Sequence, residues 1–180
     1  LRNCTVDQLL PYLKYETYSI GIIPEVLQGD FDGYALELRA WPSEVLPHLV
    51  LVVLHGESFL VCNAAGVVDG KASEERLDVL LDLIARCQQP VVLNTLAVPS
   101  SFAAQGGAQA VHVTWRLNER LAAFCSQYHH CRLVNLAGLV CRMGEHAAFD
   151  RRYWYRFKAP FRPALLRLYA AEVGAIIRDL

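Results

Sequence analysis

The sequence predicts an α/β fold of three layers, with helices on both faces of a doubly wound, mostly parallel sheet. Two segments, 49–54 and 90–94, are almost wholly aliphatic and lack polar–apolar alternation, which is typical of strands buried on both faces. Between them, residues 73–85 place apolar side chains at helical spacing after the expected cap Ser73, so we expect a strand–helix–strand crossover. The length suits one such domain, and residues 1–180 are assigned to it.

The other elements follow from capping, turn and breaker residues. Thr5 and Gln8 form a capping-box pattern that predicts a helix up to Gly21, and Pro11 indicates a kink or a later start. Pro163 suits the first turn of the last helix. The remaining expectations are strands at 22–27 and 131–136, loops at 29–33 and 55–58, and helices at 34–39, 109–128 and 163–177.

Composition and hydropathy argue against a membrane or secreted protein. Apolar residues make up 54% of the chain and charged residues 19%, but no apolar run approaches the ~18 residues that span a bilayer. The N-terminus has no basic-then-apolar signal pattern, so we expect a cytoplasmic protein. The six cysteines lie in apolar surroundings such as 60–62 and 121–125, which favours reduced core thiols over a disulfide framework.

Positive charge is concentrated near the C-terminus. Residues 142–167 contain seven basic and two acidic residues, a net charge of +5 in a chain whose total is −1, and aromatic residues are interleaved with these cations. The segment either contacts an acidic partner or a phosphate, or is a solvated face whose aromatic residues anchor the last helix. No nucleic-acid partner is expected, because the cations and aromatics fall in one segment and not on paired strands.

Polar residues follow the expected strands, where ligands bind in open α/β sheets. Their order resembles the SGNH, or GDSL-type, hydrolases, but the nucleophile position holds Cys4 in place of serine. Glu57 and Ser58 stand where the oxyanion-hole asparagine is expected, and Tyr153 replaces the histidine base. Without that imidazole, a serine mechanism lacks a proton acceptor. The expected ligand-binding residues at these points are Asn3, Thr5, Gly29, Gly56, Ser58 and Asp150.

An active form of this site would use Cys4. A thiol at a helix start has a lowered pKa because of the helix dipole. In this hypothesis His146 is the base, Gly56 and Ser58 supply donors, and the domain is an esterase or acyltransferase. Cysteines in apolar surroundings more often serve packing, so this function is the alternative to a docking role.

Three ordered motifs, at 3–13, 29–38 and 149–161, span nearly the whole chain together with the last helix. They resemble the N-terminal, SGNH-like domain of FkbH-like proteins, which belong to subfamily IIIC of the HAD superfamily. The resemblance implies a flavodoxin-like fold for this domain. In that family a HAD-type phosphatase domain follows this one. The resemblance implies transfer of a glyceryl unit from a phosphorylated glycerate to an acyl carrier protein in polyketide biosynthesis.

The resemblance also implies a role for the basic segment. Because carrier proteins are acidic and the hydrolase motifs are incomplete, we expect this domain to dock and position partners; a scaffold that only packs against its neighbour is a third possibility. The expected carrier contacts are Arg151, Arg152, Arg156 and Lys158. Leu1 and Arg2 are expected to end a strand that precedes the first helix, in a chain excised from a longer polypeptide with a HAD domain downstream.

Other motifs are weaker. Residues 30–33 resemble the HAD aspartate motif, but no aliphatic strand directly precedes them and Tyr34 follows, so loop aspartates are favoured. Four possible metal ligands near the end of the 109–128 helix lack a well-spaced second pair, so zinc is not expected. They are Cys125, His129, His130 and Cys131. Without a glycine-rich phosphate loop, we expect no nucleotide, other cofactor or metal in this domain.

Overall fold

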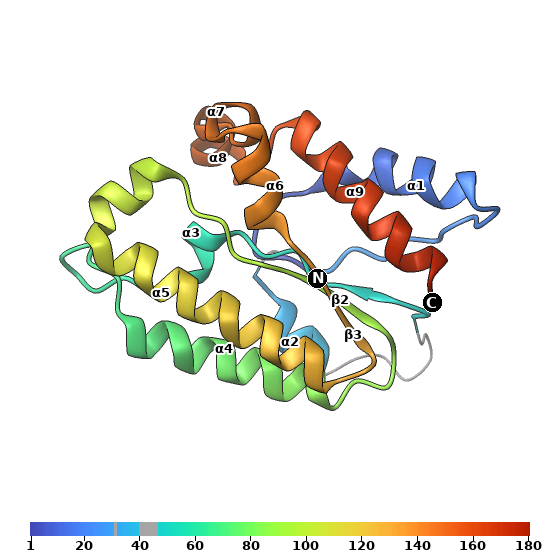
Figure 1. Cartoon of the computed structure of the whole chain (residues 1–180), viewed down its shortest axis with the longest axis horizontal. Coiled ribbons are helices and arrows are strands. Elements are labelled where there is room, and N and C mark those ends of the chain that lie inside the picture. The colour runs from blue at the N-terminus through green and yellow to red at the C-terminus, as the bar shows by residue number, and fades with distance from the viewer. Residues whose placement is uncertain (31, 40–46) are drawn as a thin grey trace.

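The computed structural model describes residues 1–30, 32–39 and 47–180, with the backbone alone at 105–107. The elements in chain order are η1 (Asp7–Leu9), α1 (Leu10–Ser19), α2 (Tyr34–Arg39), β1 (Val50–Leu51), α3 (Gly56–Phe59), α4 (Gly70–Ala85), β2 (Val91–Asn94), α5 (Ser100–Gln127), β3 (Cys131–Val134), α6 (Leu136–Met143), α7 (Glu145–Ala148), α8 (Arg151–Phe157) and α9 (Pro163–Arg178). The strands form a parallel sheet in the order β1–β2–β3 (Figure 1).

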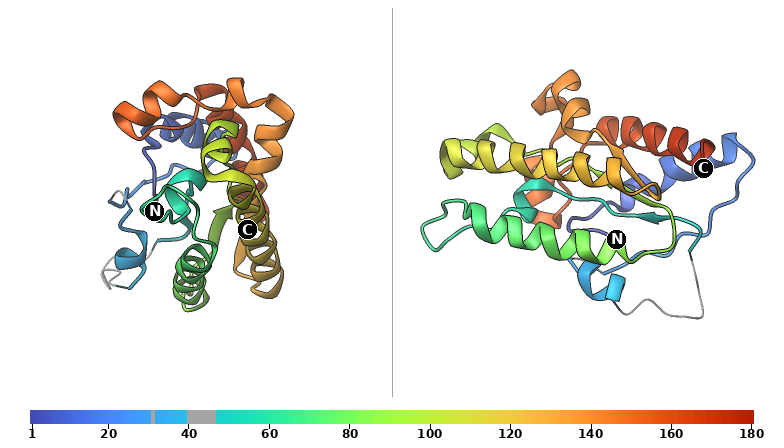
Figure 2. Two further views of the ribbon diagram at one scale, coloured as in Figure 1. Left: turned by 90° about the vertical axis from the view of Figure 1, so that its left-hand side faces the viewer. Right: turned by 60° about the horizontal axis from the view of Figure 1, so that its bottom comes forward.

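Side chains of β2 alternate between two hydrophobic cores. Val91 and Leu93 pack into the core formed with α2, α4 and α5, whereas Val92 packs into the core formed with α1, α6 and α9. Figures 1 and 2 show α4 and α5 on one side of the strands and α1 and α9 on the other. A strand that buries both faces in this way requires helices on both sides. The predicted three-layer α/β/α fold is confirmed.

The N-terminal residues extend the sheet beyond β1. Arg2 forms a parallel bridge with Val53, whose amide donates to the Leu1 carbonyl at 2.9 Å. The expected strand character of Leu1 and Arg2 is therefore confirmed. The regular ladder of the predicted strand 49–54 covers only Val50–Leu51, because Val53 pairs with Arg2 and Leu54 pairs with a side chain.

The first helix begins later than the capping pattern predicts. No side chain caps η1, and the Thr5 amide donates to the Lys158 carbonyl at 2.6 Å, so the predicted capping box is wrong. The chain enters α1 through η1, and Pro11 occupies the first turn of α1, where a missing N–H is tolerated. Gly21 follows the helix with φ of 81°, as expected for a residue that ends it.

The helix over 73–85 also has a different cap. Asp69 accepts a hydrogen bond from the Ala72 amide at 3.0 Å and caps α4. Ser73 is buried in the first turn, where its hydroxyl accepts from the Val61 amide at 3.0 Å and donates to the Asp69 carbonyl at 2.7 Å. Ser73 is therefore a tertiary contact, and its predicted capping role is wrong. The apolar spacing was correct, since α4 buries Leu77 and its helical neighbours.

Several other helix and strand boundaries differ from the predicted ones. Residues 22–27 form no strand: the segment takes part in none of the strand pairs or bridges between described residues, and Ile23 is 85% exposed. α5 begins at Ser100, nine residues before the predicted start at 109. β3 ends at Val134 because the next residue caps α6. The predicted helices at 34–39 and 163–177 are confirmed.

Segments around the carboxyl edge of the sheet are more helical than expected. Most of α3 lies in the predicted loop 55–58, and two further short helices, α7 and α8, precede α9. Of the predicted loop 29–33, Phe31 lies outside the described residues. Within the described part of the chain, no helix combines the length and hydropathy needed to cross a bilayer. All six cysteines are free thiols.

Candidate functional site

At the carboxyl edge of the sheet, asparagine side chains form hydrogen bonds with the backbone of neighbouring segments. Asn94 accepts from the Leu54 amide at 2.9 Å and donates to the Leu54 carbonyl at 2.8 Å. Asn3 pairs in the same way with the backbone of His55, at 2.6 and 3.2 Å. Each carboxamide thus supplies the two hydrogen bonds that a neighbouring strand would otherwise provide, which satisfies buried backbone groups.

The same pattern holds the segment after β2. Asn118 of α5 accepts from the Leu96 amide at 2.6 Å and donates to its carbonyl at 2.9 Å. After β3, Asn135 caps α6 by accepting from the Gly138 amide at 2.8 Å. The Thr95 hydroxyl accepts from an amide of α6 at 2.9 Å. These strand-end polar groups are engaged by the backbone and serve the fold.

His55, which directly follows the 49–54 segment, is different. Its ring is buried and packs edge-on against Trp154, with the ring centres 4.4 Å apart, and against Phe149 and Phe161. Nδ1 lies 3.0 Å from the Ser58 hydroxyl, while the buried Nε2 has no hydrogen-bond partner among the described residues. Desolvation lowers the pKa of His55 to about 3, so the imidazole is neutral at physiological pH.

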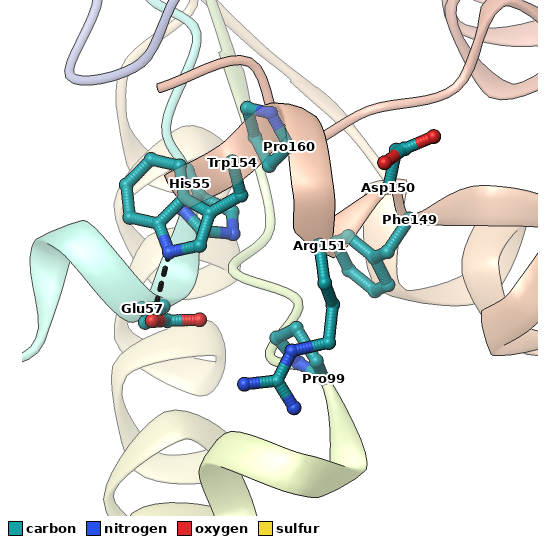
Figure 3. Close-up of a pocket in the computed structure, with 8 residues that line it drawn as sticks. All are labelled: His55, Glu57, Pro99, Phe149, Asp150, Arg151, Trp154 and Pro160. Carbon is teal, nitrogen blue, oxygen red and sulfur yellow. Dashed lines mark hydrogen bonds between the residues drawn. The ribbon is translucent and has the colours of Figure 1, made fainter. Parts of the chain in front are cut away.

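A small hollow borders this imidazole (Figure 3). The Trp154 indole N–H donates to the Glu57 carboxylate at 2.8 Å and lies across His55. The hollow holds about 10 Å³, which is about enough for one water molecule. It is lined by His55, Glu57, Pro99, Phe149, Asp150, Arg151, Trp154 and Pro160. Four of these residues are apolar, and the other four carry polar or charged side chains.

α8 lies beside this hollow, between two short segments, 149–150 and 160–161, that pair with each other and are called the neck. Phe149 and Phe161 form an antiparallel bridge, and the Asp150 amide donates to the Pro160 carbonyl at 2.7 Å. Asp150 caps α8 by accepting from the Tyr153 amide at 3.1 Å, and its carboxylate lies 3.7 Å from Arg162. The predicted ligand-binding residue Asp150 therefore lines the hollow while it also fixes the start of α8.

The two residues of the predicted thiol mechanism have contrasting environments. Cys4 is fully buried in the core beneath α9, and burial raises the pKa of its thiol far above the usual range. His146 is exposed on α7. The thiol does not lie in the first turn of a helix, so the helix dipole expected to lower its pKa does not act on it. The roles of Cys4 and His146 stay a prediction, and the burial of Cys4 counts against it.

The predicted glycine positions are sites of close approach. A Cβ on Gly56 would lie 2.6 Å from the Ala97 carbonyl oxygen, so only glycine fits where α3 meets the segment after β2. A Cβ on Gly29 would overlap the carboxylate of Glu37, which accepts from the Asp30 amide at 2.5 Å. Gly29 therefore belongs to a local loop. Ser58 lies beside His55, as given above.

The predicted carrier contacts gather on and beside α8. Arg152, Arg156 and Lys158 are exposed, and Arg151 stacks on the Tyr155 ring and donates to its hydroxyl at 2.6 Å. Lys158 ends α8 in the left-handed conformation and lies over the Trp154 ring at 4.8 Å. The outer surface of α8 is thus basic and aromatic, and Trp154 is the residue that the helix buries.

The described residues contain no group of three or more metal-ligating side chains placed to hold an ion. His130 Nε2 lies 3.1 Å from the Ile84 carbonyl, which gives this histidine a hydrogen-bond partner just before β3. In the HAD-like segment, Asp32 pairs with Arg76 at 2.7 Å.

The fold is similar to that of a crystal structure described as the N-terminal part of the protein BF1531 from Bacteroides fragilis, containing a phosphatase domain and complexed with Mg. The TM-score is 0.81 at 16% identity, and the match covers 98% of this chain and 50% of that chain. This chain therefore spans about half the length of that protein part. No family model and no curated protein matches the sequence.

The sequence alone did not single out His55, Trp154 or Asn94, whose two hydrogen bonds to the Leu54 backbone are called the Asn94 clamp. Each had a signal: His55 directly follows an aliphatic strand, Asn94 ends one, and Trp154 is an aromatic residue within the basic segment. What the sequence lacked was the contact of Trp154 with Glu57 and His55, about a hundred residues away along the chain.

Proposed function

We propose that this chain is an SGNH-like docking domain that works beside a HAD-type phosphatase domain of the same polypeptide. In this proposal the polypeptide loads a glyceryl unit from a phosphorylated glycerate onto an acyl carrier protein in polyketide biosynthesis. The observation that carries the proposal is the structural match, which spans 98% of this chain and half of a protein part that contains a phosphatase domain.

The strand ends support a docking role over ester hydrolysis. The Asn94 amide donates to the backbone carbonyls of both Leu54 and Thr95, so it offers no free donor to an oxyanion, and the Asn3 amide donates to the His55 carbonyl. HAD-type phosphatases need an aspartate directly after a strand, and here His55 and Asn94 occupy the ends of the 49–54 and β2 strands. This half of the match is therefore assigned to the partner of the phosphatase domain.

The surface of α8 is the proposed contact for the carrier protein. Its exposed Arg152 and Arg156, with Lys158 at its end, present positive charge beside exposed Tyr153 and Phe157. An acidic carrier would be steered to such a surface, with an affinity that falls as salt screens the charges.

The experiment measures binding of the cognate carrier protein by calorimetry at several salt concentrations. We expect binding to weaken with added NaCl and the double variant Arg152→Glu, Arg156→Glu to weaken it about tenfold or more, since each reversal replaces attraction with repulsion. The matched control is Lys71→Glu in α4 with Arg86→Glu directly after it, the same charge change at exposed positions of another element. Binding that is absent, insensitive to salt or equally weakened by both variants would refute carrier docking on α8.

A further inference from the structure

We propose that α8 is a hinged cover and that the space beneath Trp154 is a binding site for a short uncharged amide or similar carbonyl group, with His55 Nε2 as its hydrogen-bond partner. The starting observation is that Nε2 is buried and has no hydrogen-bond partner in the described part of the chain. Buried polar atoms are nearly always hydrogen-bonded, so an orphaned one marks a place where a partner is expected.

The attachment of α8 is suited to movement. The neck at Phe149 and Phe161 fixes both ends of the segment, while the left-handed Lys158 separates α8 from the neck. Along the helix itself, Trp154 is the buried anchor, and its hydrogen bond to Glu57 connects it to α3. To leave His55, the helix must break the bond between the Trp154 indole and Glu57 and withdraw the indole from the core, while the Thr5 amide, which donates to the Lys158 carbonyl, holds the end of α8 in place.

The volume that the Trp154 indole occupies limits the size of the ligand. The hollow of about 10 Å³ admits one water molecule at most, so a larger ligand requires the indole to leave. An indole that swings outward vacates room for a group of its own size. The ligand is therefore short.

The walls decide its chemistry. Phe149, Pro99 and Pro160 offer apolar contacts, which suit the carbon atoms of a short chain. The charged side chains of the lining are Glu57, Asp150 and Arg151, and the carboxylate of Asp150 lies 3.7 Å from Arg162 outside the lining. The lining thus has no excess of positive charge that would favour an anion. A neutral amide has both a carbonyl and an N–H, so it matches Nε2 in either tautomer that the Ser58 hydroxyl selects.

The cover is tested by reacting the whole chain with diethyl pyrocarbonate and following each histidine by mass spectrometry. We expect His55 to react at least about tenfold more slowly than the exposed His129, because reaction requires the charge-assisted Trp154–Glu57 bond to open. Trp154→Ala should raise the His55 rate about tenfold, and Glu57→Gln should raise it by less because the indole packing remains. Trp115→Ala, at an exposed tryptophan of α5, is the matched control and should leave the rate unchanged.

The ligand is tested by NMR with N-methylacetamide, using sodium acetate as the charged comparison. We expect the amide to shift the Trp154 indole N–H signal of the wild-type chain and to have no such effect in His55→Phe. Acetate should leave the signal in place, because the Glu57 carboxylate next to the indole repels it.

Two sets of results would overturn the proposal. The cover is refuted if His55 reacts as fast as His129 in the wild type, or stays protected in folded Trp154→Ala. The amide site is refuted by an absent response, an equal response to acetate or a response that survives His55→Phe. Glu57→Gln keeps the test decisive if Trp154→Ala does not fold. None of these measurements involves the carrier protein, so they separate this site from the docking function.

Discussion

Asn94 and His55 end neighbouring strands of one sheet and are both fully buried, yet their hydrogen bonding differs. Asn94 makes hydrogen bonds to the backbone of Leu54 and Thr95, and its oxygen lies 3.4 Å from the Tyr169 hydroxyl. His55 has one ring nitrogen near the Ser58 hydroxyl and one that meets no hydrogen-bond partner among the residues that the structure describes. A polar side chain whose hydrogen bonds are all made to the protein stabilises the fold, whereas one with an unpaired atom at the same edge can bind a ligand.

The largest effect is expected from Asn94→Leu. The change leaves the buried amide and carbonyl of Leu54 without partners, so we expect a loss of about 3 kcal/mol in the free energy of unfolding. Urea denaturation measures this loss. The control is Asn63→Ala, an exposed amide that bonds only within its own turn and should cost about 1 kcal/mol or less. Equal losses for the two variants would contradict the clamp.

A smaller, pH-dependent effect is expected at His55. Its pKa is lowered to about 3 in the folded chain, so below the unfolded value of about 6.5 the unfolded state binds the extra proton. The stabilisation is complete above about pH 6.5 and is lost as the pH falls toward 3.

Between pH 6 and pH 4, His55→Phe should therefore remove about 2 kcal/mol of the acid-dependent loss. The measurement is urea denaturation at each pH. His129→Gln, at an exposed histidine, should leave the slope with pH as it is in the wild type. A wild-type slope retained in His55→Phe would show that the imidazole is not held neutral by burial.

The smallest effect concerns Cys4, a third buried group near this edge. Because its thiol packs in the core and its pKa is raised, we expect Cys4→Ala to cost about 1 kcal/mol of stability and to leave ester or thioester turnover unchanged. Cys141→Ala, at an exposed cysteine, should change neither quantity. Turnover by the wild type that disappears in folded Cys4→Ala would instead establish the thiol as a nucleophile.

Local pattern was a good guide wherever one segment determines its own structure. The strands at 90–94 and 131–136 and the helix from Pro163 were predicted because apolar periodicity and breaker residues are local signals. The cap at Ser73 and the strand at 22–27 were wrong because each depends on a neighbour. The Ser73 hydroxyl accepts from the amide of Val61, twelve residues earlier, and residues 22–27 pair with no strand among the described residues.

The sequence by itself determined the three-layer class, because continuous aliphatic strands must be covered on both faces. It also determined the basic and aromatic character of the segment that becomes α8. Only the tertiary structure decided that Cys4 is buried, that Asn3 and Asn94 serve the backbone, and that Trp154 covers His55. The physical reason is that hydrogen-bond satisfaction and desolvation depend on which distant residues meet in space.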